Sequence, residues 1–245
     1  MARSFFLLFG TLAYLIFFGT FLYLVAFVGD LPWVPRTLDR PEGVAGGAAV
    51  AIDLALVLLF GLQHSLMARK GFKAGWTRIV PAPIERSTYV LFASLALIAM
   101  FLFWQPLPEV VWNVENEAAR LVLWALFGLG WVIVLISTLL ISHFELFGLK
   151  QVWSHARGAP AEAPVFRQPF FYRLVRHPIY SGFFIAFWAT PEMTRGHLLF
   201  AAAMSVYMVI AIRYEERDLV GLFGQDYEDY RARVGKLAPR LMRRG

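Results

Sequence analysis

An uncharged apolar run from Phe5 to Val28 constrains the fold of this chain more than any other feature. At 1.5 Å per residue, a helix of this length crosses a hydrocarbon core of about 30 Å. The run is longer than the core of a typical signal peptide, and no small-residue cleavage pattern follows it. Because 59% of all residues are hydrophobic and only 16% are charged, we predict an integral membrane protein that retains this first helix.

Five further apolar segments follow, so the expected fold class is an all-α integral membrane bundle with about five to six transmembrane segments. Lipid offers the backbone no hydrogen-bond partner, and each spanning segment should therefore be helical. The last two segments are short and should form a helical hairpin that turns near Pro191. We expect one membrane-embedded domain over residues 1–245, with a cytoplasmic tail at 213–245 and transmembrane segments at 5–28, 44–62, 88–104, 121–141, 179–193 and 196–212.

Lysine and arginine residues are distributed unevenly among the loops. They gather after the second and fourth segments and in the tail, whereas the loops after the first and third segments are mainly acidic. Cytoplasmic loops are enriched in Lys and Arg, so both termini should be cytoplasmic. The Lys and Arg residues of these cytoplasmic segments account for the net charge of +6, and they would lie against the anionic lipids of the bilayer. We therefore infer the lipid bilayer as a partner and no nucleic acid.

Several classes of site are disfavoured by the residues present. The chain has no cysteine, which excludes disulfides, thiolate metal sites and a cysteine nucleophile. The histidines are scattered without metal-ligand spacing, so no metal is expected. Gly-rich nucleotide-binding motifs are missing. A Ser-His-acid hydrolase stays open, although the usual Gly-x-Ser-x-Gly elbow is absent.

Polar residues gather at the predicted cytoplasmic ends of the helices. Gln63-His64-Ser65 ends the second segment, and Glu85-Arg86-Ser87-Thr88-Tyr89 begins the third. Each group also has a structural explanation, because Ser87 or Thr88 would serve as an N-cap and a lone interfacial histidine is more often structural than catalytic. Asp53 lies inside the second segment, toward the outer half, where a structural role is expected.

The short hairpin is bracketed by charged and aromatic residues. The segment from Arg176 to Gly182 opens it, and Arg213-Tyr214-Glu215-Glu216 closes it. Aromatic rings bind cations, carboxylates bind amino groups or ribose hydroxyls, and arginine binds carboxylates. These brackets therefore favour a site for a small zwitterionic or cationic cofactor at one membrane face.

The two brackets, followed by Phe223-Gly224-x-x-Tyr227-x-x-Tyr230, resemble the isoprenylcysteine carboxyl methyltransferase and phospholipid methyltransferase superfamily. This resemblance covers about the last third of the chain. It implies an integral membrane enzyme that uses S-adenosylmethionine. By position, it implies that the cofactor site contains Arg176, His177, Tyr180, Gly182, Arg213, Glu215 and Glu216.

The first two thirds of the chain resemble bacterial methanethiol S-methyltransferases. This similarity rests on the segment from Gln63 to Arg69, Phe72-Lys73, the segment from Glu85 to Val90, and the segment from His143 to Gln151. It implies methylation of methanethiol to dimethyl sulfide in the bacterial inner membrane, and it adds Gln151 to the cofactor site. We expect His64 to be the base, because a neutral imidazole at this depth can accept the thiol proton, with Ser65, Glu85, Arg86 and Tyr89 orienting it or lining the pocket.

Two other classes remain open. A methyltransferase for a prenylcysteine or phospholipid acceptor would share the cofactor motifs but need a lateral opening between helices. A non-enzymatic carrier, coupled to protons through Asp53 and His64, would need neither the bracketed hairpin nor the paired glutamates.

Overall fold

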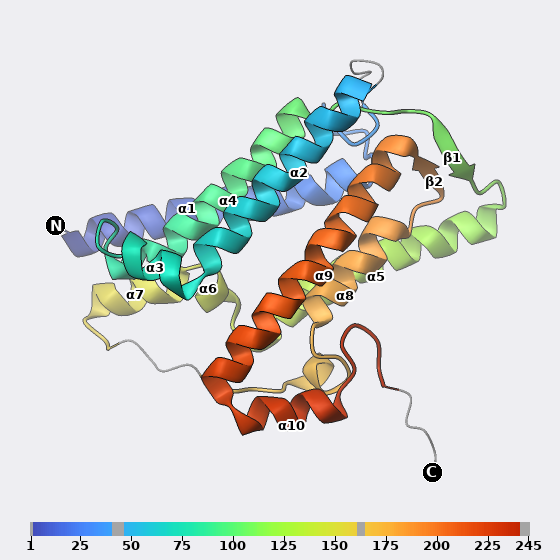
Figure 1. The fold of residues 1–245 in the computed structure, drawn as a ribbon. Coiled ribbons are helices and arrows are strands. Elements are labelled where there is room, and N and C mark those ends of the chain that lie inside the picture. The colour runs from blue at the N-terminus through green and yellow to red at the C-terminus, as the bar shows by residue number, and fades with distance from the viewer. Residues whose placement is uncertain (1, 41–46, 161–164, 241–245) are drawn as a thin grey trace, which may run out of the picture. The chain divides into compact units, whose positions relative to one another are not determined.

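The computed structural model describes residues 2–40, 47–160 and 165–240 (Figure 1). Within these ranges, five helices are long and apolar enough to cross a membrane, which confirms the predicted all-α membrane fold. They are α1 (Ala2–Val28), α2 (Gly47–Ala68), α4 (Ala82–Phe103), α5 (Glu117–Ile141) and α9 (Arg195–Phe223). The shorter elements are α3 (Lys70–Trp76), α6 (His143–Leu146), α7 (Leu149–Arg157), η1 (Phe170–Arg173), α8 (Pro178–Trp188) and α10 (Gln225–Arg233), with strands β1 (Val110–Asn113) and β2 (Glu192–Thr194).

The bracketed hairpin differs from its expected form. Helix α8 has 11 residues, about 16 Å at 1.5 Å per residue, which is too short for a hydrocarbon core of about 30 Å. Strand β2 follows it and pairs with β1. Helix α9 continues beyond Ile212 to Phe223, so the segment from Arg213 to Glu216 is helical and the expected start of the tail at residue 213 lies within this helix.

The chain divides into two compact units. The first unit contains α1 to α4, α6 and α7, together with residues 193–200. The second contains α5, η1, α8, α10 and the part of α9 from residue 201 onward. The single domain expected from the sequence stays a prediction.

Helix α4 is the centre of the first unit, where it packs against α1 and α2. It begins at Ala82, with a proline in its first turn and Glu85 close to its positive end. The N-cap expected at Ser87 or Thr88 is therefore wrong, because both residues lie inside the helix. The Ser87 hydroxyl instead donates to the carbonyl of Gly148, 3.4 Å away, before α7.

Two glycines allow α5 and α8 to approach closely in the second unit. A Cβ atom at Gly182 would lie 2.6 Å from the carbonyl oxygen of Gly130, and one at Gly130 would lie 2.6 Å from the backbone nitrogen of Ala186. Small residues at such crossings let helix backbones touch. The presence of Gly182 therefore has a packing explanation beside its predicted cofactor role.

Candidate functional site

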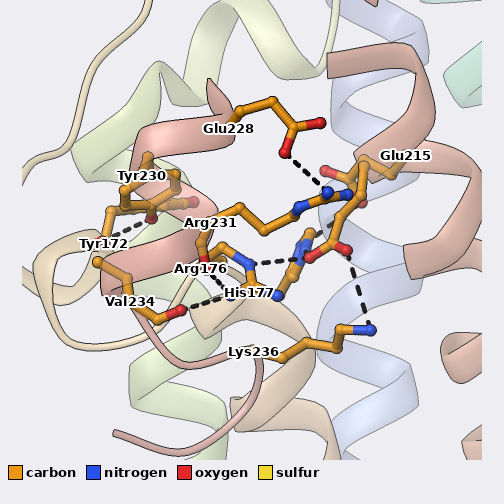
Figure 2. A network of polar contacts seen from close by, with 10 residues as sticks. Tyr172, Arg176, His177, Glu215, Glu228, Tyr230, Arg231, Val234 and Lys236 are labelled. Carbon is orange, nitrogen blue, oxygen red and sulfur yellow. Dashed lines mark hydrogen bonds and ion pairs between the residues drawn. The ribbon is translucent and has the colours of Figure 1, made fainter. Parts of the chain in front are cut away.

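The second unit brings the two predicted brackets together around Glu216 (Figure 2). Arg176 Nε lies 2.9 Å from Glu216 Oε1, and His177 Nε2 lies 3.1 Å from the same oxygen. Lys236 Nζ lies 3.8 Å from Glu216 Oε2. The Glu216 side chain is only 10% exposed. Its carboxylate is therefore already surrounded by positive or hydrogen-bonding groups of the protein.

Glu215 has a different environment from its neighbour. Its side chain is 45% exposed, and its Oε2 lies 3.9 Å from His177 Nδ1. The Tyr180 ring packs edge-on against the His177 ring, with the centroids 5.7 Å apart. An accessible carboxylate near an aromatic ring and an imidazole can bind a cationic group. The residues present thus fit a positively charged cofactor, and the Glu215 side chain would be the protein carboxylate that faces its charge.

Arg176 also holds the segment that follows α10. Its guanidinium donates to the carbonyl of Arg231 at 3.0 Å and to that of Val234. Its backbone N–H donates to the carbonyl of Gly235 at 2.8 Å, and that of His177 donates to the carbonyl of Lys236 at 3.1 Å. Arg176 is therefore a clamp on the C-terminal segment, whereas Arg213 is exposed.

Buried tyrosines support this arrangement from α10 and η1. The Tyr230 hydroxyl donates to the carbonyl of Tyr172 at 2.6 Å, and the Tyr172 hydroxyl donates to the carbonyl of Ser137 at 3.3 Å. Burial raises the pKa of Tyr230 to about 12, and it raises the pKa of Tyr172 as well. A tyrosine is already protonated near neutral pH, and the raised pKa values extend this range to alkaline pH, so both hydroxyls act as hydrogen-bond donors.

The first unit contains a second cluster of polar side chains, around His64. The Tyr89 hydroxyl lies 2.8 Å from His64 Nε2. The Arg86 guanidinium lies 4.8 Å from the centroid of the Tyr89 ring, and its Nε donates to the carbonyl of Leu146 at 2.7 Å. His64 from α2 and Tyr89 and Arg86 from α4 are thus in contact with one another, and Arg86 links them to the last residue of α6.

Helix α3 adds residues that sequence reasoning did not assign to the site. Lys73 Nζ lies 3.9 Å from Glu85 Oε1, and burial lowers the pKa of Lys73. Trp76 packs on the buried cluster that contains Met67 and Tyr89. Lys73 belongs to the Phe72-Lys73 pair on which the family resemblance partly rests, but no pattern in the sequence indicated Trp76. Ser65 is half-buried one residue beyond His64.

Several buried polar atoms of the first unit have no hydrogen-bond partner among the residues that the structure describes. They include Gln63 Oε1, Trp76 Nε1, Glu85 Oε1 and Gln151 Oε1. Buried polar atoms are almost always hydrogen-bonded, so such atoms are candidates for contact with water or a ligand. The Gln151 amide nitrogen donates to the carbonyl of Glu145 at 3.0 Å. Gln151 belongs to the first unit, whereas the other predicted cofactor residues belong to the second.

Known proteins resemble this chain over nearly its whole length. It is 50% identical to the methanethiol S-methyltransferase of Mycobacterium tuberculosis, over 98% of each chain. It is 52% identical to methanethiol S-methyltransferase 1 of Bradyrhizobium diazoefficiens, over 95% of this chain and 81% of that one. Human nurim is a more distant relative, 33% identical over 70% of this chain and 68% of its own. No family model and no solved structure matches the chain. The chain therefore belongs to the methanethiol S-methyltransferase family.

Proposed function

We propose that this protein methylates methanethiol to dimethyl sulfide at the membrane, with S-adenosylmethionine as the methyl donor. The observation that carries this proposal is the 50% identity, over 98% of both chains, to a protein named methanethiol S-methyltransferase. In the reaction, a bond forms between the thiol sulfur and the methyl carbon while the carbon–sulfonium bond breaks. The thiol proton must leave to a base.

The second unit supplies the residues for the cofactor. When bound, S-adenosylmethionine provides an electrophilic methyl group on a positively charged sulfur. Glu215, which is 45% exposed, balances positive charge on the cofactor, and the Tyr180 ring binds beside it. Glu216 and Arg176 act through other groups, because their 2.9 Å ion pair holds His177 and the C-terminal segment in position. Gly182 and Arg213 complete the proposed cofactor residues of this unit, and Gln151, on α7 in the first unit, is a further proposed cofactor residue.

His64 is the proposed base. A small alkyl thiol is mostly protonated near neutral pH, as free cysteine with a pKa of about 8.5 already is, yet the thiolate is the nucleophile. His64 Nε2 accepts the thiol proton through the Tyr89 hydroxyl, which lies 2.8 Å from it. The Arg86 guanidinium, 4.8 Å from the centroid of the Tyr89 ring, favours the thiolate that remains once the proton has left. Ser65 and Glu85 complete the proposed catalytic residues of the first unit.

We propose a bacterial inner-membrane location, with both termini in the cytoplasm as the distribution of Lys and Arg favours. Although α8 is short, β2 follows it and pairs with β1 after α4, so the segment from α8 to β2 supplies the sixth crossing that this orientation needs. In this orientation the ends of α2 and α4 that contain His64 and Tyr89 face the cytoplasm. The segment from Arg213 to Glu216 does so as well, where a soluble cofactor is available.

A headspace assay for dimethyl sulfide tests the proposed reaction. Purified protein is supplied with S-adenosylmethionine and methanethiol, with prenylcysteine and phosphatidylethanolamine as alternative acceptors. We expect volatile product from methanethiol alone. Protein that binds S-adenosylmethionine but methylates only a lipid or prenyl acceptor would refute the assigned acceptor. Protein that binds no S-adenosylmethionine would refute the assigned donor.

A further inference from the structure

A groove in the first unit lies outside the residues assigned to catalysis. It runs between the first turns of α1 and the end of α7, and it is lined by Arg3, Ser4, Leu7, Leu8, Thr11 and Ala156. The groove exists because α7 packs closely against α1. A Cβ atom at Gly10 would lie 2.6 Å from Val152, and the ring centroids of Phe6 and His155 are 5.5 Å apart.

One end of this groove is cationic. The Arg3 guanidinium lies beside Gly158, since Arg3 Nη1 is 3.7 Å from the position that a Cβ atom of Gly158 would occupy. Gly158 directly follows Arg157, whose guanidinium lies 5.2 Å from the centroid of the Trp153 ring. Two arginines from different helices therefore lie near the C-terminal end of α7: Arg3 lines the groove, and Arg157 is adjacent to the lining residue Ala156. Guanidinium groups bind phosphate oxygens through two parallel hydrogen bonds.

Beyond Arg3 and Ser4, the α1 wall of the groove presents the apolar side chains of Leu7 and Leu8, and α1 is long and apolar enough to span a membrane. Leu8 is 59% exposed on α1, within a window of mean hydropathy 2.1. Trp153 on α7 is 53% exposed. Helix α7 packs against the first turns of the spanning helix α1, and exposed tryptophan near the end of a spanning helix is typical of the membrane–water interface. The groove thus combines a phosphate-binding end with a surface suited to an acyl chain.

We propose that this groove binds an anionic phospholipid, with its phosphate at Arg3 and Arg157 and an acyl chain along Leu7 and Leu8. The apolar wall favours a lipid over a soluble phosphate. The charge of the two arginines favours an anionic headgroup over a zwitterionic one. This site is independent of the methyl-transfer chemistry, since it uses none of the residues assigned to the acceptor or the cofactor.

Native mass spectrometry of the full-length protein, released from micelles that contain phosphatidylglycerol or phosphatidylcholine, tests this site. We expect retention of phosphatidylglycerol in preference to phosphatidylcholine, and a loss of about tenfold in Arg3→Gln, since one charge-assisted contact contributes about 1.4 kcal/mol or more. Arg157→Gln should weaken retention similarly. Arg78→Gln is the matched control, because it removes an exposed arginine after α3 and outside the groove.

Three results would overturn the proposal. Equal losses in Arg3→Gln and Arg78→Gln would mean that bulk charge alone attracts the lipid. Equal retention of the two lipids by the unaltered protein would mean that the groove does not select a headgroup. Displacement of phosphatidylglycerol by inorganic phosphate at comparable concentration would mean that the apolar wall contributes nothing. If Arg3→Gln fails to fold, the comparison of Arg157→Gln with Arg78→Gln decides.

Discussion

Replacing the adjacent residues Glu215 and Glu216 by glutamine should affect two different properties of the protein. Glu216 is 10% exposed and pairs with Arg176, whose side chain is 9% exposed. Glu215 is 45% exposed and has its oxygen 3.9 Å from the His177 imidazole. We expect Glu216→Gln to destabilise the fold and Glu215→Gln to weaken cofactor binding.

The magnitudes follow from these environments. Removing one partner of a buried ion pair costs about 3–5 kcal/mol, because the other charge stays buried. For a chain of 245 residues, each kcal/mol shifts the Tm by about 2–4 °C, so Glu216→Gln should lower it by on the order of 10 °C. An exposed carboxylate contributes at most about 1 kcal/mol to stability. Losing its charge-assisted hydrogen bond to a ligand costs about 1.5–3 kcal/mol, or roughly 10- to 150-fold in Kd.

Two measurements on the same detergent-purified variants separate these effects. Thermal unfolding gives the Tm without ligand, and isothermal titration with S-adenosylmethionine gives the Kd well below that temperature. The reasoning fails if Glu216→Gln unfolds at the temperature of the unaltered protein. It also fails if Glu215→Gln binds the cofactor with unchanged affinity.

Three further predictions concern the base, the helix crossing and the buried tyrosine. His64→Gln should lower turnover of methanethiol by about 10²- to 10⁴-fold with unchanged affinity for S-adenosylmethionine, and Tyr89→Phe should act in the same direction; normal turnover in both would exclude this base. Gly182→Ala places a Cβ atom 2.6 Å from the Gly130 carbonyl oxygen, so it should cost about 1–3 kcal/mol in thermal unfolding, whereas lost cofactor affinity at an unchanged Tm would favour a binding role. The pKa of Tyr230 is about 12 in the folded protein and about 10 in an unfolded chain. The folded state therefore keeps this proton to a higher pH than the unfolded chain, and the free energy of unfolding should fall as pH rises from about 10 to 12. In Tyr230→Phe, the free energy of unfolding, measured by denaturation at each pH, should fall less steeply over this range; a fall as steep as in the unaltered protein would contradict this.

The apolar runs locate the long helices but not their ends. The third segment was expected to begin at residue 88, yet α4 begins at Ala82, and α9 continues to Phe223. Hydropathy identifies residues suited to hydrocarbon, whereas a helix also includes polar turns whose backbone is hydrogen-bonded in the same way. The short α8 shows the opposite error. It ends at Trp188 before Pro191, because the residue before a proline disfavours helical geometry.

Several polar residues that motif order grouped lie in contact in the structure, while their roles stay predictions. Arg176 and His177 meet Glu216 although they are far apart in sequence, and His64 meets Tyr89. Trp76 and Lys236 were not assigned, since neither belongs to a recognisable pattern of chemistry-bearing residues. Their proximity to Met67 and Glu216 follows from how α3 and the C-terminal segment pack.

Composition, apolar runs and motif order are enough to establish a helical membrane protein and to suggest its family, because both depend on residue types along the chain. The roles of Glu215 and Glu216 are different. Successive residues on a helix point about 100° apart, so neighbours in the sequence face different surroundings. Only the folded chain reveals that Glu216 is enclosed by Arg176 and His177 while Glu215 stays accessible, because that depends on which distant segments pack against each side of α9.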